Sequence, residues 1–478
     1  MNETNELTYK EPSLPNTISY GLSGFWSMLA YGVFNSYLIF FYEAVVGLNI
    51  VYVFWAMVIF TVWDAINDPL IGHLTDRVTK YTRKVGKRFI WIVIGIIPAN
   101  FVLALVFMPP AGNPSTDPLP FFGWIVFTTV LFDSLYTLCF VNIEALFPDK
   151  FRTDRARRRA RGWGTPLSMI ALPVANIVPP IILGLFGGGE IDVQAAYIPM
   201  IWLIVGTIAP ISLLFLPGMH ENKEIIERYY ISKEKPESFI SALKSTLKQK
   251  SFVYYIILFF GFQVVTGSLT ASIPFAANYV LPGPPFGTPI NMILLFATFL
   301  QAAIISVPIW IRIAKKLQNN KKSALIGGVC LIGGTTLVPF SIWNIWFSLV
   351  SMTILGLTMG NFWALFTVYF ADVLDERVIL TKSPRRGATV GVASFLSRFA
   401  RGAQVAIFAI MHILTGFFED PAPGITPQTP LAQIGIAFHM GWIPAIILTI
   451  CTLIYWKFYP ITPQIWMKNK QKLKELGF

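Results

Sequence analysis

The sequence predicts an all-α membrane protein with about twelve transmembrane helices, and three observations support this fold class. The 478 residues are 54% hydrophobic and only 13% charged, whereas soluble domains carry roughly a quarter charged residues. The apolar residues fall into repeated runs of about 20 residues, the length that spans a bilayer. The 40 Phe and 14 Trp residues suit lipid-facing surfaces and interfacial belts. We therefore expect the lipid bilayer to be a partner of this chain.

The expected spans follow the apolar runs, and the longer ones should tilt or protrude. They cover residues 18–46, 50–73, 89–110, 120–147, 166–187, 196–217, 250–281, 288–312, 322–341, 344–372, 389–417 and 432–459. The longest connection between helices is charged and divides the chain into two halves of six helices. The predicted parts are an N-terminal half (1–217), a cytoplasmic linker (218–249), a C-terminal half (250–459) and a cytoplasmic tail (460–478).

The basic residues predict the orientation of the chain. If the N-terminus is cytoplasmic, 35 of the 37 Lys and Arg residues lie in cytoplasmic segments, such as 148–165, whereas the opposite loops 111–119 and 188–195 have none. This is the positive-inside pattern, and it accounts for the net charge of +12 without a nucleic-acid partner. The N-terminus lacks a basic signal region, so the first helix should direct insertion. We expect a multi-pass plasma-membrane protein with both termini in the cytoplasm.

The second expected helix carries two acidic residues, Asp64 and Asp68, at i, i+4 spacing. Both carboxylates therefore project from one face of the helix. An acidic group deep in the bilayer costs several kcal/mol unless it faces a partner, water or an ion, and two on one face repel each other. A bound cation, or protonation of at least one carboxyl group, would relieve both costs. The alternative is that neutral or paired carboxyls only hold helices together.

The fourth expected helix offers a complementary polar face. Asp133 and Thr137 should lie at about the depth of Asp64 and Asp68 because both helices run from outside to inside. Carboxylate, amide and hydroxyl oxygens together suit a hard cation, although a threonine alone more often bonds to its own helix backbone. Glu144 follows on the same face near the cytoplasmic end, where it could contact substrate or form an ion pair in a gate.

Arg398 and Arg401 are the two basic residues inside the eleventh expected helix. A buried guanidinium requires a carboxylate, and the depth of Arg398 matches that of Asp64. These two side chains would then form a pair between the halves that is broken or remade as the halves move. The alternatives are that Arg398 binds substrate through its donor fork or forms a purely structural pair.

Enzymatic activity is not expected from this sequence. The four histidines are scattered, and there is no HExxH, GxSxG, Walker motif or paired cysteine. We therefore expect no cofactor other than a transported coupling ion.

Two six-helix halves joined by a cytoplasmic linker are typical of the major facilitator fold. The segment Trp63-Asp64-Ala-Ile-Asn67-Asp68-Pro69, followed by Gly72 and by Gly86-Lys87-Arg88, resembles the melibiose permease group, the glycoside–pentoside–hexuronide cation symporters. Tyr136-Thr137, Ala145-Leu146-Phe147-Pro148 and Tyr369-Phe370-Ala371-Asp372 also fit, so the resemblance covers nearly the whole chain.

The resemblance implies a cation site and a basic residue between the halves, but not the sugar site of the permease. The implied cation ligands are Asp64, Asn67, Asp68 and Thr137, with Asp64 and Asp68 holding Na⁺ if the ion is sodium. Arg398 stands where the permease has lysine. The permease has a Lys-Asp pair where this chain has Ser27-Met28, and its sugar-binding Asp and Trp fall at Phe140 and Glu144. We therefore take Asp133 and Glu144 as the hypothesis for acids that replace those lost elsewhere. Further candidates for substrate contact or coupling are Tyr136, Asn35 and Trp63.

The sequence therefore predicts a monomeric secondary active symporter that couples Na⁺ or H⁺ to a small molecule by alternating access. A sugar or glycoside is the expected substrate. The alternative is a sodium-dependent symporter of lysolipids or other amphiphiles, which the aromatic-rich composition would also suit. A membrane scaffold or receptor without transport is a further alternative, but such a protein has no use for costly buried acids.

Overall fold

The structure is a computed structural model, and it describes residues 11–75, 82–186, 193–231, 239–281, 283, 285–381, 387–418 and 427–475. Within these residues it contains helices and no strands. Eleven of the described helical segments are long and apolar enough to cross a membrane. The all-α membrane fold predicted from the sequence is thus confirmed.

The chain forms two compact units, which we call the N-terminal unit and the C-terminal unit. The N-terminal unit comprises Met1–Phe34 and Val62–Pro236, and the C-terminal unit comprises Asn35–Thr61 and Glu237–Phe478. The segment Asn35–Thr61 therefore packs with helices that follow it by some 200 residues in the chain. The first two long helices each have residues in both units. The division expected from the sequence instead assigns both of these helices entirely to the N-terminal half (1–217).

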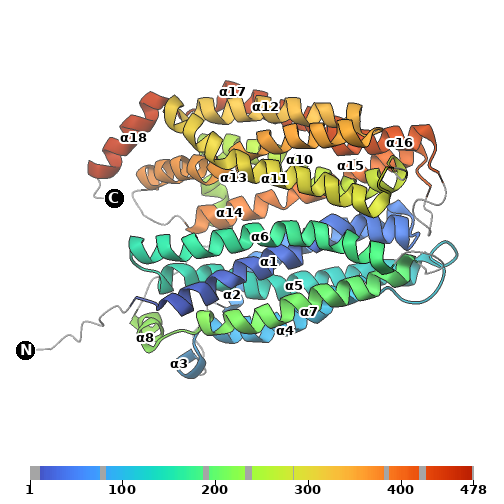
Figure 1. Ribbon diagram of the computed structural model, residues 1–478. Helices are drawn as coiled ribbons and strands as arrows, with labels where there is room; N and C mark the ends of the chain where they lie inside the picture. The colour runs from blue at the N-terminus through green and yellow to red at the C-terminus, as the bar shows by residue number, and fades with distance from the viewer. Residues whose placement is uncertain are drawn as a thin grey trace, which may run out of the picture. The chain divides into compact units, whose positions relative to one another are not determined.

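The N-terminal unit is built from the helices coloured blue to green in Figure 1. They are the first part of α1 (Leu14–Phe40), the second part of α2 (Ile50–Thr75), α3 (Thr82–Val85), α4 (Phe89–Val106), α5 (Pro118–Lys150), α6 (Asp154–Phe186), α7 (Val193–Met219) and α8 (Lys223–Ile231). The helices α1 and α6 cross closely at two glycines, because a Cβ added at Gly21 would lie 3.1 Å from the backbone of Gly164. Small residues at such crossings let membrane helices approach.

The helix α6 begins twelve residues before the expected span 166–187. Its first turns read Asp154-Arg-Ala-Arg-Arg-Arg-Ala-Arg161, and Arg and Ala are among the strongest helix formers. Hydropathy marks only the apolar part of such a helix, so the span prediction missed the polar turns that precede it.

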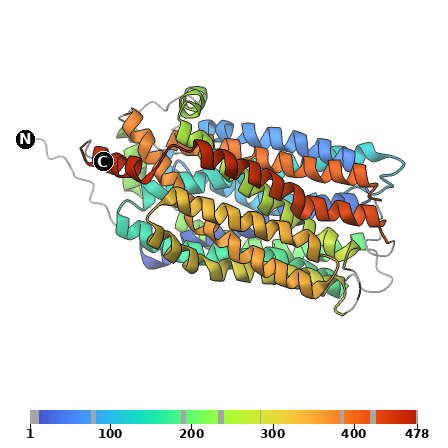
Figure 2. The same ribbon diagram turned by 90° about the horizontal axis from the view of Figure 1, so that it is seen from above.

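The C-terminal unit contains the remaining helices, coloured green to red in Figure 2. Besides the segment Asn35–Thr61 with the π-helix η1 (Phe41–Val45), they are α9 (Phe239–Leu247), α10 (Lys250–Tyr279), α11 (Thr288–Leu317), α12 (Asn320–Ser341), α13 (Ile345–Thr381), α14 (Gly387–Ser397), α15 (Phe399–Thr415), α16 (Pro430–Ala437), the π-helix η2 (Phe438–Trp442), α17 (Ile443–Phe458) and α18 (Pro463–Glu475). The helices α11 and α13 pack tightly at Gly356, where an added Cβ would lie 2.3 Å from the carbonyl oxygen of Phe299.

The expected span 389–417 is interrupted at Arg398, which separates α14 from α15. The backbone N–H of Arg398 bonds the carbonyl of Phe395 at 3.3 Å, and the N–H of Arg401 bonds the carbonyl of Arg398 at 3.1 Å. These i→i−3 bonds tighten the chain locally into a 3₁₀-like turn. The interruption leaves α15 with 17 residues, and counting α14 and α15 as one broken span brings the eleven helical segments to the twelve expected.

Candidate functional site

The second and fourth expected spans meet in the N-terminal unit through polar side chains. Asn67 on α2 donates its amide N–H to Asp133 on α5, with 2.9 Å to Oδ2 and 3.2 Å to the backbone oxygen. One turn away, the indole Nε1 of Trp63 donates to Oγ of Ser134 at 2.9 Å. These bonds fix the register of α2 against α5, and they bring together residues that sequence reasoning placed at similar depth.

Most of the polar side chains of this cluster are buried. Asp64, Asn67 and Asp133 are at most 1% exposed, and Thr137 is 2% exposed. Asp68 is only half-buried. Burial of a carboxylate is costly unless hydrogen bonds or an ion compensate it, and here three Asp side chains lie on two neighbouring helices. Acidic side chains therefore lie at positions where apolar side chains would cost less free energy.

Tyr136, next to Thr137 on α5, lies at the centre of a stack of aromatic rings. Its ring stacks on Trp26 at 5.3 Å, on Tyr31 at 5.0 Å and on Phe140 at 5.7 Å between centroids. Trp26 is held in turn by Asn100 of α4, whose Oδ1 accepts from the indole Nε1 at 2.8 Å. Asn100 also donates to Ser212 of α7 at 2.9 Å, so four helices of the unit position this stack.

Sequence reasoning did not single out Trp26, Tyr31 or Asn100. The expectation for the first helix concerned Ser27 and Met28, which stand in place of a charged pair. The informative signal would have been the aromatic residues of α1 at positions 26, 31 and 34, together with a polar Asn inside the apolar run of α4. Aromatic residues are frequent throughout this chain, so their pattern alone does not separate a stack from lipid-facing rings.

Glu144 lies apart from the buried acids and is half exposed. Its Oε2 is 3.8 Å from the guanidinium of Arg161 on α6, and the exposed fractions of the two side chains are 48% and 61%. Arg161 also covers the ring of Phe147 at 4.4 Å. Such exposed pairs contribute little stability. Of the two interpretations given for Glu144, this arrangement corresponds to the ion pair.

The remaining candidates, Arg398 and Asn35, belong to the C-terminal unit. Both are half-buried. The neighbouring Arg401 lies over the ring of Phe60 at 5.2 Å, a cation–π arrangement within the same unit. A pair between Arg398 and Asp64 would join the two units, and it stays a prediction.

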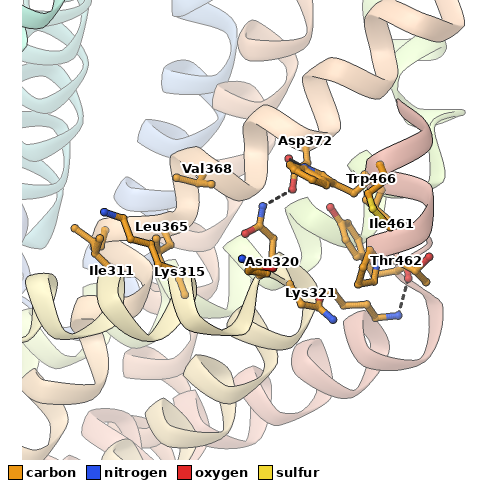
Figure 3. A pocket seen from close by; sticks show the side chains of 17 residues that line it. Ile311, Lys315, Asn320, Lys321, Leu365, Val368, Asp372, Ile461, Thr462 and Trp466 are labelled. Carbon is orange, nitrogen blue, oxygen red and sulfur yellow. Dashed lines mark hydrogen bonds between the residues drawn. The ribbon is translucent and has the colours of Figure 1, made fainter. Parts of the chain in front are cut away.

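The C-terminal unit contains a cavity of about 900 Å³ that includes none of the predicted site residues. Figure 3 shows Asp372 of α13 among the lining side chains, with Oδ2 accepting from Asn320 at 2.6 Å. Oδ1 of Asp372 accepts from the indole N–H of Trp466 at 2.9 Å, which ties α18 to α13. Lys470 and Asp375 add a second tie at 2.7 Å. These contacts account for Asp372 as an anchor of the last helix.

Known proteins resemble this chain along nearly its whole length. A family model described as MFS/sugar transport protein matches residues 19–463. The isoprimeverose transporter of Lactiplantibacillus pentosus is 24% identical, over 95% of this chain and 91% of that protein. The sodium-dependent lysophosphatidylcholine symporter 1 of Mus musculus is 22% identical, over 87% and 79% respectively. The crystal structure of a D-xylose-proton symporter has the same fold, with a TM-score of 0.60 at 15% identity over 93% of this chain and 98% of that one.

Proposed function

Because the chain belongs to the MFS/sugar transport protein family, we propose that it is a cation-coupled symporter of a sugar or glycoside. The observation that carries this proposal is the buried acidic cluster of α2 and α5, in which Asn67 bonds Asp133 beside the fully buried Asp64. The transported ion, Na⁺ or H⁺, would bind at Asp64 and Asp68, with Asn67 and Thr137 contributing oxygen atoms.

Ion binding would couple to substrate binding through the charge of the cluster. Without a cation, the carboxylates of Asp64, Asp68 and Asp133 repel one another in surroundings of low polarity. A cation removes that repulsion and stabilises the arrangement of α2 against α5. Since linkage between two bound ligands is reciprocal, a substrate that favours the same arrangement strengthens cation binding by the same factor.

The aromatic stack on Tyr136 supports a sugar as the substrate. The apolar faces of sugar rings pack against aromatic rings, and binding pockets combine such rings with a few precisely placed polar groups. Tyr31 and Phe140, which both stack on Tyr136, are half-buried. The relative named as an isoprimeverose transporter is consistent with this substrate class.

An amphiphile is the second candidate substrate, and one specific observation favours it. The ring cluster of α1 and α5 also includes Phe34 and Phe132, which stack at 5.1 Å, so the surroundings of Tyr136 are apolar as well as aromatic. One relative is named as a sodium-dependent lysophosphatidylcholine symporter. Competition of sugar uptake by a lysolipid below its micellar concentration would separate the two substrates.

The location and assembly of the protein form the remaining part of the proposal. Multi-pass insertion together with the positive-inside distribution of Lys and Arg supports a plasma-membrane protein with cytoplasmic termini. The proposal also takes the protein to function as a monomer.

Asp68→Asn tests the coupling in reconstituted vesicles with an inward Na⁺ or H⁺ gradient. The substitution keeps side-chain size and removes one negative charge, so gradient-driven uptake should fall to the background of empty vesicles. Asp117→Asn is the matched control because Asp117 is exposed before α5 and its side chain forms no cap bond. Undiminished accumulation by the Asp68→Asn protein would overturn the proposed coupling site.

A further inference from the structure

The cavity of about 900 Å³ in the C-terminal unit lies where α11 ends and where α12 and α18 begin. The second half of α13 forms a further wall through Leu365, Val368 and Asp372 (Figure 3). Ligand sites in proteins are commonly clefts of roughly 300–1,000 Å³, so this cavity has room for a ligand. Its lining includes no residue of α2 or α5, and the site proposed for the cation therefore does not account for it.

Most of the side chains that line this cavity are apolar. Leu365 is buried, whereas Val368, Trp466 and Met467 are 42%, 39% and 58% exposed. The helices α11 and α13 are both long and apolar enough to cross a membrane, so the medium around them is lipid. Exposed apolar side chains around a hollow are typical of a site for an apolar ligand or a membrane lipid.

Two lysine side chains give the cavity a positive charge. The segment 312–322 contains five Lys and Arg residues, of which Lys315 and Lys321 line the cavity. Lys315 is exposed. The ammonium group of Lys321 donates to the backbone oxygen of Tyr459 at 2.7 Å, and an ammonium group has three N–H donors. Figure 3 shows the two lysine side chains on different sides of the cavity.

One acidic side chain, Asp372, also lines the cavity, but hydrogen bonds already engage both of its carboxylate oxygens. Oδ2 accepts from Asn320 and Oδ1 accepts from the indole of Trp466. Two ammonium groups and one carboxylate leave the lining with a formal charge of +1. Lys316 and Lys322, exposed in the same segment, add to the positive potential. The cavity therefore attracts an anion.

An apolar lining beside basic side chains fits an anionic phospholipid better than a soluble anion. A soluble phosphate gains nothing from the apolar walls, and a neutral lipid gains little from the lysines. The segment 312–322 also lies at the side of the membrane that the positive-inside pattern predicts to be cytoplasmic, where the leaflet contains anionic lipids. Basic pockets between membrane helices on this side bind the headgroups of such lipids.

We propose that this cavity binds one anionic phospholipid of the cytoplasmic leaflet. The ammonium groups of Lys315 and Lys321 attract the phosphate, and an acyl chain lies along Leu365, Val368 and Met467. The bound lipid contacts α11, α13 and α18 together. This inference concerns a cavity without any of the proposed cation ligands, and it does not depend on which substrate the protein transports.

The first test measures lipid binding to the full-length protein in detergent by native mass spectrometry. The probes are dioleoyl phosphatidylglycerol, which is anionic, and dioleoyl phosphatidylcholine, which has the same chains and no net charge. We expect Lys315→Gln and Lys321→Gln each to weaken phosphatidylglycerol binding about fivefold, and the combined variant about 25-fold. Phosphatidylcholine should bind more weakly and with the same affinity to all variants.

Lys322→Gln is the matched control for these two variants. Lys322 is exposed in the same basic segment but does not line the cavity, and exposed charges are screened by salt. Its loss should therefore weaken phosphatidylglycerol binding by less than about twofold. An effect as large as that of Lys315→Gln would show only diffuse attraction to a basic surface and would overturn the proposal.

Val368→Trp tests the apolar part of the site while both lysines stay in place. The larger side chain occupies the cavity, and losing the burial of about two CH₂ groups of an acyl chain weakens binding roughly tenfold. Val350→Trp is its control, because Val350 is exposed on the same helix and does not line the cavity. Competition by millimolar glycerol 3-phosphate would assign the site to soluble phosphates and contradict the proposal.

Photocrosslinking of the unchanged protein gives a readout that does not require any variant to fold. The protein is placed in phosphatidylcholine nanodiscs with a small fraction of phosphatidylglycerol that carries a diazirine in its acyl chain. We expect the crosslinked peptides to be enriched in those that contain Val368 or Met467, and unlabelled phosphatidylglycerol should compete. Crosslinks spread evenly over the apolar spans, or equal crosslinking by a phosphatidylcholine probe, would each overturn the proposal.

Discussion

The bond between Asn67 and Asp133 allows a quantitative test of whether the cluster on α2 and α5 is charged. Hydrogen bonds between membrane helices contribute about 0.6 kcal/mol on average in double-mutant cycles, whereas bonds to a charged group contribute about 1.5–3 kcal/mol. The Asn67 amide contacts both Oδ2 and the backbone oxygen of Asp133, at 2.9 Å and 3.2 Å. If Asp133 is ionised, we expect the coupling energy to lie in the higher range.

The experiment is a double-mutant cycle with Asn67→Ala, Asp133→Ala and the combined variant, because each single substitution then removes the side-chain bond. Unfolding of each protein by a rising mole fraction of a denaturing detergent gives its free energy of unfolding. A coupling of about 1.5 kcal/mol corresponds to a change of roughly tenfold in the unfolding equilibrium constant. Trp63→Phe is a useful comparison because it removes a bond between the neutral groups of Trp63 and Ser134 on the same two helices.

A coupling energy at or below about 0.6 kcal/mol would refute the reasoning, since it would show that Asp133 behaves as a neutral acceptor. Repeating the cycle with and without Na⁺ adds a second criterion. If a cation binds among these carboxylates, saturating Na⁺ should stabilise the unchanged protein more than the Asp133→Ala variant, by mass action on the folded state.

Two further predictions concern the C-terminal unit. Gly356→Ile should lower the free energy of unfolding by about 1–3 kcal/mol or more, because an added Cβ would lie 2.3 Å from a carbonyl oxygen of α11. Gly333→Ala is the control in the same unfolding assay, because a Cβ added at Gly333 would have nothing within 4 Å. Asp372→Ala should release α18 by removing the acceptor of Trp466, so limited proteolysis should cleave the tail faster. Equal cleavage rates for this variant and the unchanged protein would contradict the anchoring role.

The helices could be predicted largely from hydropathy because each membrane span must bury a long apolar run. The ends and interruptions could not, because they depend on other energies. The polar first turns of α6 form through the helix propensity of Arg and Ala, which hydropathy does not measure. The break at Arg398 involves a local change of hydrogen bonding within a sequence that reads as one continuous span.

Which residues lie at the depth of the predicted cation residues could be predicted from the sequence, for a geometric reason. Two antiparallel or parallel spans of known direction place residues at calculable depths, at about 1.5 Å per residue, so Asp133 could be matched with Asp64 and Asp68. Depth does not specify rotation about the helix axis. The bond from Asn67 to Asp133, and the stack of Trp26 and Tyr31 on Tyr136, depend on that rotation and became visible only in the structure.

The burial of Glu43 could not be predicted from the sequence, for a related physical reason. Asp64 stands out in the sequence because it lies near the middle of an apolar span, where a carboxylate is costly wherever the helix packs. Glu43 lies three residues from the end of the expected span 18–46, where a carboxylate normally reaches water at little cost. Its burial arises because η1 packs in the same unit as α10 and α15, which follow it by more than 200 residues. The cost of an ionisable group near a helix end is therefore set by tertiary packing, and no local pattern around Glu43 encodes its hydrogen-bond partner His412.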